Sequence, residues 1–168
     1  MPVHPAELEV RAFALTFPET HEDFPWGHRL IKVRGKAFVF MSNDEPDLSV
    51  SVKLPWSSEG ALQFPFCEPT HYGMGQHGWV TASFPAGMKR PKVRPAGEWP
   101  PLPALRSWIE ESYRAVAPKK LVKALDEAQA ERTAALLEER RAPKARKAPA
   151  AKRSRSVKAA KARAARRG

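Results

Sequence analysis

The sequence has 168 residues, of which 42% are hydrophobic, with one cysteine and a formal net charge of +11. This length suits one domain with or without an appendage, and the single cysteine excludes an internal disulfide and fits a reducing compartment. No charged start precedes a long apolar run and no apolar run reaches the length of a membrane span, so we expect a soluble cytoplasmic protein.

The first expected element is a helix between Pro5 and Pro18. Proline favours the first turn of a helix and cannot continue its hydrogen-bond ladder, so these residues mark a start and a stop. Apolar residues recurring with the helical period predict its buried face: Leu8, Ala12 and Leu15, with Phe13 beside them. The stretch at 21–28 shows no period and is interpreted as irregular.

Alternation with a period of two then predicts four antiparallel strands. Two β-rich runs on either side of Arg34-Gly35-Lys36 are typical of a tight hairpin. A third strand covers 48–54 after a turn at 43–47, and a fourth covers 79–84. In the third strand, the alternation places Leu48, Val50, Val52 and Leu54 inward and Ser49, Ser51 and Lys53 outward.

Helices are predicted again after the third strand. Residues 57–64 are a weak helix candidate, and six prolines between 85 and 103 indicate an extended connection. From residue 104 the helical period returns, with a face formed by Leu105, Ile109, Ser112/Tyr113 and Val116. After Ala117-Pro118, a largely polar helix is expected over 119–141, in which Leu121, Val122 and Leu125 can dock.

This order of elements predicts an α+β fold, with an antiparallel sheet packed against helices in a two-layer sandwich. We expect an α+β domain over 1–125, a polar helical extension over 126–142 and a disordered basic tail over 143–168. The tail consists of Ala, Lys, Arg, Ser, Pro and single Val and Gly residues without an aromatic side chain, so it cannot bury enough apolar surface to fold.

The stretch THYGMGQHGWVT at 70–81 contains the densest group of chemically versatile side chains. His71 and His77 lie six residues apart and Cys67 lies four residues before His71, but no CxxC pair or third ligand accompanies them. The glycines do not form a phosphate-binding G-x-G-x-x-G before a helix, and they suit a turn that needs positive φ. We therefore expect no metal, no cofactor and a turn that leads into the fourth strand.

Catalytic motifs are also missing from the sequence. His21-Glu22 is not followed by a second histidine at the zincin spacing, and no G-x-S-x-G surrounds a serine. We therefore predict a non-enzymatic protein with no catalytic residues. An enzyme would need His71 or His77 to share a cleft with a carboxylate such as Glu22, Asp23 or Glu68.

Nucleic-acid binding has the strongest physical support. Residues 1–139 have a net charge of −2, whereas residues 140–168 contain 13 Lys and Arg and no acid. Such a block binds phosphates without sequence preference, and its lack of aromatics indicates backbone contacts only. The expected tail contacts are Lys144, Arg146, Lys147, Lys152, Arg153, Arg155, Lys158, Lys161, Arg163, Arg166 and Arg167. The domain offers further candidates in Arg34, Lys36, Lys53, Lys89, Arg90, Lys92 and Arg94, for which ordinary solvent-facing charge is an equal alternative.

A second hypothesis belongs to another class of protein. In it, the domain binds a small ligand or a protein partner and the tail only aids localisation. It requires one concave pocket that holds the side chains Trp26, His28, Tyr72, His77 and Trp79 together.

The order of several segments resembles the MmcQ/YjbR family of small bacterial proteins. These segments are EDFPWG at 22–27, the hairpin at 31–40, GWV at 78–80 and SYRAVAPKKL at 112–121, and the resemblance covers about residues 6–125. It implies a frataxin-like (CyaY-like) α+β fold and DNA binding through a proposed double-wing surface, and it supplies no catalytic residues. The proline-rich loop at 85–103 looks longer than the usual link. The tail resembles the Lys/Ala-rich extensions of nucleoid-associated proteins.

Together, these observations predict a DNA-binding protein of the nucleoid that is not an enzyme. The tail would contact phosphates, the α+β domain would serve as a platform, and duplex DNA is the expected partner. No membrane partner is expected.

Overall fold

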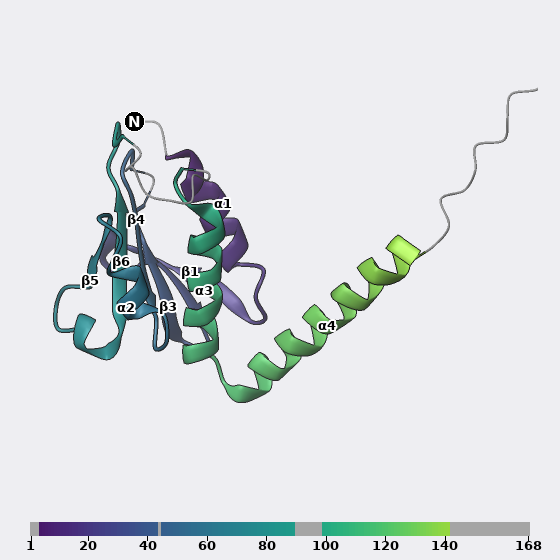
Figure 1. Ribbon diagram of the computed structural model, residues 1–168. Coiled ribbons are helices and arrows are strands. Elements are labelled where there is room, and N and C mark those ends of the chain that lie inside the picture. Colours follow the sequence, from purple (N-terminus) through teal and green to yellow (C-terminus); the bar gives the residue numbers. More distant parts are fainter. Residues whose placement is uncertain (1–3, 44, 90–98, 142–168) are drawn as a thin grey trace, which may run out of the picture. The chain divides into compact units, whose positions relative to one another are not determined.

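The computed structural model describes residues 4–43, 45–89 and 99–141 (Figure 1). Its helices are α1 (Pro5–Ala14), α2 (Ser58–Ala61), α3 (Leu102–Val116) and α4 (Lys119–Arg141), with short 3-10 turns η1 (Pro25–Gly27) and η2 (Gly75–His77). Its strands are β1 (Thr20–Asp23), β2 (Arg29–Val33), β3 (Lys36–Met41), β4 (Leu48–Lys53), β5 (Cys67–Pro69) and β6 (Trp79–Phe84). The chain separates into two compact units, one ending at Arg132 and the other beginning at Thr133, and the account below concerns the first unless stated.

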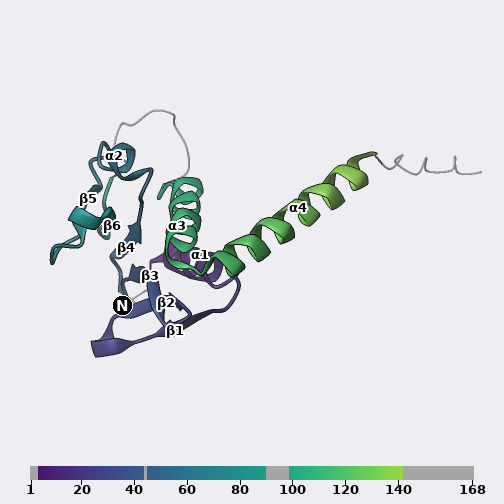
Figure 2. The same ribbon diagram turned by 90° about the horizontal axis from the view of Figure 1, so that it is seen from below.

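The strands form one antiparallel sheet in the order β1-β2-β3-β4-β6-β5 (Figure 2). The hairpin between β2 and β3 turns on Arg34 and Gly35, both at positive φ (49° and 77°), which is the geometry of a type I′ turn. The expected α+β class is therefore confirmed. The predicted hairpin and the strands at 48–54 and 79–84 are present as β2, β3, β4 and β6, and the last of these has the predicted bounds.

Two strands were not expected from the sequence. Most of β1 lies in the stretch interpreted as irregular, and this strand pairs with β2 through Thr20↔Val33 to Asp23↔Leu30. β5 lies at the opposite edge and pairs with β6 through Cys67↔Ala82. Both are short edge strands without an alternating apolar pattern, so their pairing partner determines their conformation.

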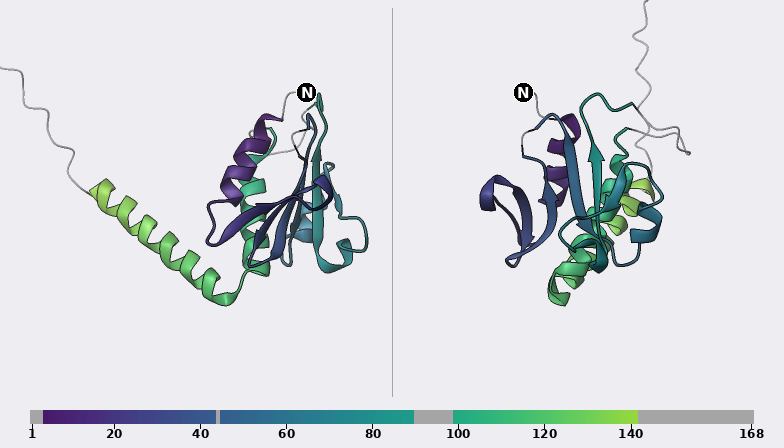
Figure 3. Two further views of the ribbon diagram at one scale, coloured as in Figure 1. Left: turned by 180° about the vertical axis from the view of Figure 1, so that it is seen from behind. Right: turned by 90° about the vertical axis from the view of Figure 1, so that its left-hand side faces the viewer.

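Helices α1 and α3 lie on the same side of the sheet (Figure 1; Figure 3, left). The strand residues that face them are buried and lie opposite one another across neighbouring strands, as in Val39↔Val52 and Val52↔Val80. The predicted inward set of β4 is confirmed, because Leu48, Val50, Val52 and Leu54 are each at most 2% exposed. The core of the molecule therefore lies between the sheet and these two helices.

The predicted buried face of α1 is wrong. Leu8 is 57% exposed, Ala12 is exposed, and Leu15 and Phe13 are only half-buried. The buried residues are instead the neighbouring stripe Ala6, Glu7, Val10 and Ala14. Small side chains at i, i+4 and i+8 allow this helix to approach its neighbours closely. The helix also ends at Ala14, before Pro18 is reached.

A buried ion pair explains the position of Glu7 in that stripe. Its carboxylate accepts a hydrogen bond from the Arg29 guanidinium of β2, and both side chains are at most 5% exposed. Glu22 of β1 lies 3.3 Å from Arg29 Nε and forms a two-pronged pair with Arg11 of α1 at 2.6 and 2.7 Å. A charge can be buried when it is paired, so a glutamate occupies a position that the periodicity assigns to an apolar residue.

Helix α3 presents the predicted face. Leu105, Ile109, Ser112 and Tyr113 are buried, and Trp108 and Leu102 extend this face. The ring of Tyr113 stacks on Phe17 with centroids 4.8 Å apart. The predicted break at Ala117-Pro118 is also confirmed, since α3 ends at Val116 and α4 begins at Lys119.

Helix α4 covers 119–141, as predicted from the sequence, with Leu121 and Leu125 buried and Val122 half-buried. Among the residues that the structure describes, no helix is both long enough and apolar enough to cross a lipid bilayer. The tail expected to be disordered, 143–168, lies outside the described residues.

Candidate functional site

The turn between β5 and β6 contains the stretch 70–78 singled out from the sequence. Its ends are tied by the Thr70 amide, which donates to the Trp79 carbonyl at 3.0 Å, and by the Gly75 amide, which donates to the Thr70 carbonyl at 3.0 Å. Gly78 has a φ of 80°, as the glycine-rich turn requires. A Cβ at Gly75 would lie 2.6 Å from the Pro69 Cβ, so the turn has no room for a larger residue there.

A groove of about 570 Å³ lies where this turn meets the sheet. Phe40 of β3, Ser49 and Ser51 of β4 and Thr81 of β6 belong to its lining. The pairs Phe40↔Ser51 and Ser51↔Thr81 place these side chains on the face of the sheet opposite the buried valines. The groove is completed by three loop segments at 27–28, 42–45 and 70–74, in which the placement of residue 44 is not described.

Three hydroxyl groups form a continuous row on this face. The Ser51 and Thr81 oxygens are 2.7 Å apart, and the Thr81 and Thr70 oxygens are 2.9 Å apart. Ser51 and Thr81 are at most 9% exposed and lie in β4 and β6, whereas Thr70 directly follows β5 and is half-buried. A second bond, from the Asn43 side-chain amide to the Gly27 carbonyl at 3.1 Å, joins two of the loop segments of the groove.

The aromatic and histidine residues considered in the ligand hypothesis are distributed over several places. His28 and Tyr72 line the groove, and Tyr72 is 100% exposed. Trp79 is half-buried against Phe40, with ring centroids 5.3 Å apart. His77 is exposed in η2 and Trp26 is 94% exposed, and neither lines the groove.

The histidines and the cysteine of this region are not assembled into a polar cluster. His71 Nε2 lies 3.6 Å from a carboxylate oxygen of Glu68, and both side chains are exposed. Burial raises the pKa of the Cys67 thiol to about 12, so the thiol is protonated at neutral pH. Within the described ranges, no three His, Cys, Asp or Glu residues are grouped so that they could hold a metal ion.

The candidate cations of the domain differ in their surroundings. Arg34 Nη2 donates to Glu19 Oε1 at 3.0 Å. Lys36 and Lys89 are exposed and Lys53 is half-exposed, with no carboxylate of the described residues within ion-pair distance. Arg90, Lys92, Arg94 and the tail cations from Lys144 to Arg167 lie outside the described residues.

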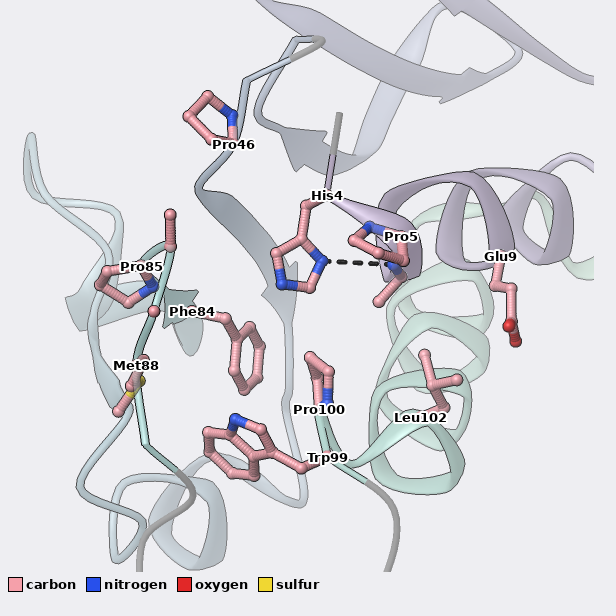
Figure 4. Close-up of a pocket in the computed structure, with 13 residues that line it drawn as sticks. His4, Pro5, Glu9, Pro46, Phe84, Pro85, Met88, Trp99, Pro100 and Leu102 are labelled. Carbon is pink, nitrogen blue, oxygen red and sulfur yellow. Dashed lines mark hydrogen bonds between the residues drawn. The ribbon is translucent and has the colours of Figure 1, made fainter. Parts of the chain in front are cut away.

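A second pocket, of about 560 Å³, lies between the start of α1 and the end of β6 (Figure 4). It is mainly apolar. The rings of Phe84 and Trp99 meet edge to face at 5.3 Å. The His4 ring is fixed by its hydrogen bond from the Ala6 amide at 3.2 Å. Its border includes residues that adjoin 1–3 and 90–98, which the structure does not describe, so we assign it no ligand.

Sequence reasoning missed the hydroxyl row. The period-two pattern correctly placed Ser49 and Ser51 outward, and the same rule places Thr81 on that face of 79–84. What the sequence did not contain was the order β4-β6-β5, which brings Thr70 and Thr81 beside Ser51. A polar outer face is also the ordinary condition of an antiparallel sheet, so the pattern gave no signal of a site.

Comparison with known protein families gave a match. The YjbR family matches residues 15–115, a range that holds all six strands, the groove and most of α3. No curated protein and no solved structure matched the chain. Because the match spans more than half of the sequence, the chain belongs to the YjbR family.

Proposed function

We propose that this protein is a non-enzymatic nucleic-acid-binding protein of the nucleoid, whose basic tail contacts phosphates while the α+β domain serves as a platform. The observation that supports this most is the separation of charge. Residues 140–168 contain 13 Lys and Arg and no acid, whereas the preceding 139 residues have a net charge of −2.

The ion pairs of the domain increase the difference in available positive charge between the domain and the tail. Of the thirteen Lys and Arg described up to residue 132, seven form salt bridges with carboxylates: Arg11, Arg29, Lys32, Arg34, Arg106, Arg114 and Lys123. More than half of the described cations of the domain are thus neutralised at short range. The tail has no acid within its own sequence, so its cations remain available to an external polyanion.

Counterion release supplies the driving force. Each phosphate neutralised by Lys or Arg releases condensed cations, so the affinity falls with salt at a logarithmic slope of about −0.9 per phosphate on duplex DNA. This term does not depend on base sequence. The resemblance to the MmcQ/YjbR family, which implies DNA binding, agrees with the same assignment.

The test compares the full-length protein with a variant of equal length in which the eleven cations from Lys144 to Arg167 are replaced by glutamine. Binding to a labelled duplex is measured over a salt series. We expect the wild-type chain to show a steep salt slope and the glutamine variant to lose most of its affinity and slope, because the phosphate contacts are gone.

A matched control replaces Lys36, Lys53 and Lys89 of the domain by glutamine and leaves the tail intact. If the tail carries the binding, this variant retains nearly the wild-type slope. Binding that survives in the tail variant and disappears in the domain variant would overturn the proposal.

A further inference from the structure

The groove on the outer face of the sheet has a chemistry unlike that of the tail. No Lys or Arg is among its lining residues in the described part of the chain, and its one acid, Glu45, repels phosphate. The other lining groups are hydroxyls, an asparagine amide, imidazoles and the apolar side chains of Phe40, Met41 and Met74. This surface suits a neutral ligand that is both polar and apolar. Its volume of about 570 Å³ falls within the range of small-ligand sites, about 300–1,000 Å³.

The hydroxyl row provides a hydrogen bond for such a ligand. Three hydroxyl groups carry three hydrogens, and the two bonds Ser51–Thr81 and Thr81–Thr70 use two of them. The third hydrogen is left on Ser51 or on Thr70 when the two bonds run in one direction, and on Thr81 when Thr81 accepts both bonds. The row can therefore donate to a carbonyl or ring nitrogen, and its lone pairs can accept from an amino group.

The rim of the groove carries an aromatic side chain in a strained position. Tyr72 has a φ of 58°, a left-handed backbone conformation that is uncommon for bulky residues. The turn retains this conformation through the bonds Met74 N to His71 O at 3.3 Å and Gly75 N to Thr70 O at 3.0 Å. Strained residues persist where the surrounding structure determines them, and they cluster at ligand clamps. The result is an aromatic ring held in solvent at the edge of a polar groove.

We propose that this groove takes an unpaired base of a single-stranded nucleic acid, with Tyr72 as the stacking platform and the Ser51–Thr81–Thr70 row as the hydrogen-bond partner of the base edge. The inference rests on the proposed function, because the tail would hold the phosphates. A base is planar, neutral and edged with both donors and acceptors, which matches the groove. The tail has no aromatic residue, so stacking must come from the domain. Paired bases in a duplex are stacked inside the double helix and cannot enter the groove.

The test uses full-length protein and a labelled single strand and duplex of equal length at one salt concentration. Because Tyr72 is wholly exposed, Tyr72→Ala leaves the fold intact. We expect it to weaken single-strand binding by at least about fivefold and to leave duplex binding unchanged. Tyr72→Phe keeps the ring and should bind like the wild type. Trp56→Ala, which removes another exposed aromatic side chain, is the matched control and should have no effect.

A second variant tests the hydroxyl row. Thr81→Val keeps the side-chain shape and removes the middle hydroxyl, and we expect about 3- to 10-fold weaker single-strand binding. A thermal melt shows whether this variant is folded. The inference is overturned if Tyr72→Ala changes single-strand and duplex binding equally or not at all. It is also overturned if free adenosine or uridine saturates the groove while Tyr72→Ala leaves oligonucleotide binding unchanged.

These outcomes separate the two proposals. If both strands bind through the tail and no groove variant matters, the groove inference is wrong and the proposed function stands. If the wild-type chain binds neither strand at low salt, both proposals are wrong.

Discussion

The carboxylate of Glu7 and the guanidinium of Arg29 are both removed from water, and each compensates the burial of the other. Glu7 lies on α1 and Arg29 on β2, so their bond attaches the first helix to the sheet. Glu22 and Arg11 extend the network to β1. Such a network adds little net stability compared with a well-packed apolar substitute, but an unpaired buried charge is costly.

This asymmetry gives the first prediction. Glu7→Gln and Arg29→Met, made singly, should each lower the free energy of unfolding by about 3–5 kcal/mol, because each leaves one charge buried without its main partner. The double variant Glu7→Leu/Arg29→Met should be more stable than either single variant. Urea unfolding followed by tryptophan fluorescence measures all three.

The control for this experiment lies on the same helix. Glu9 pairs with Arg106 at 3.1 Å in an exposed position, so Glu9→Gln should change stability by less than about 1 kcal/mol. If the Glu7 and Glu9 variants lost the same free energy of unfolding, burial of the Glu7–Arg29 pair would not explain the loss in the Glu7 variant.

One hydroxyl group of α3 bonds to the backbone of two neighbouring strands of the sheet. In the pairing of β3 with β4, the last rung is Val39↔Val52, and the next one would join Phe38 and Lys53. Ser112 of α3 replaces this missing rung. The Ser112 hydroxyl accepts a hydrogen bond from the Lys53 amide at 2.8 Å and donates one to the Phe38 carbonyl. A buried serine on the apolar face of a helix therefore satisfies two backbone groups at a gap in the ladder.

The second prediction follows from this arrangement. Ser112→Ala should lower the free energy of unfolding by about 1–3 kcal/mol, since it leaves a buried donor and a buried acceptor without a partner. Hydrogen exchange should become faster at the Lys53 amide in particular. Ser107→Ala, at an exposed position of the same helix, should be neutral in both measurements. An unchanged exchange rate at Lys53 would mean that the hydroxyl does not hold this rung.

At the scale of the whole molecule, the tail and the groove differ in whether they need a folded domain. A tail that binds phosphates does so whether or not the domain is folded, and a ligand that binds both states equally does not shift unfolding. The groove exists only in the folded state, because β3, β4, β6 and the turn at 70–78 create it. A ligand of the groove therefore stabilises the fold.

The third prediction uses this difference in a thermal melt of the full-length protein. Duplex DNA should leave the unfolding temperature unchanged, whereas a single strand at 100 times its groove Kd should add about 2.7 kcal/mol of stability. Tyr72→Ala should reduce this increase. Stabilisation by the duplex would show instead that the folded domain itself contacts double-stranded DNA.

Local patterns in the sequence were enough for much of this protein. The hairpin at Arg34-Gly35, the alternating strand at 48–54, the strand at 79–84 and the helix at 119–141 each carry their own signal, because hydrophobic period and turn residues act over a few positions. The separation of charge along the chain is also a property of the sequence alone, and so is the family resemblance.

Only the tertiary structure decided the features that depend on residues distant in the chain. β1 and β5 are strands because a neighbour pairs with them, and Glu7 is buried because Arg29 reaches it from another element. The groove depends on the order β4-β6-β5, which places Thr70 and Thr81 beside Ser51. Local propensity follows from neighbouring residues, whereas edge pairing, buried charge and a ligand groove follow from long-range contacts that no local pattern encodes.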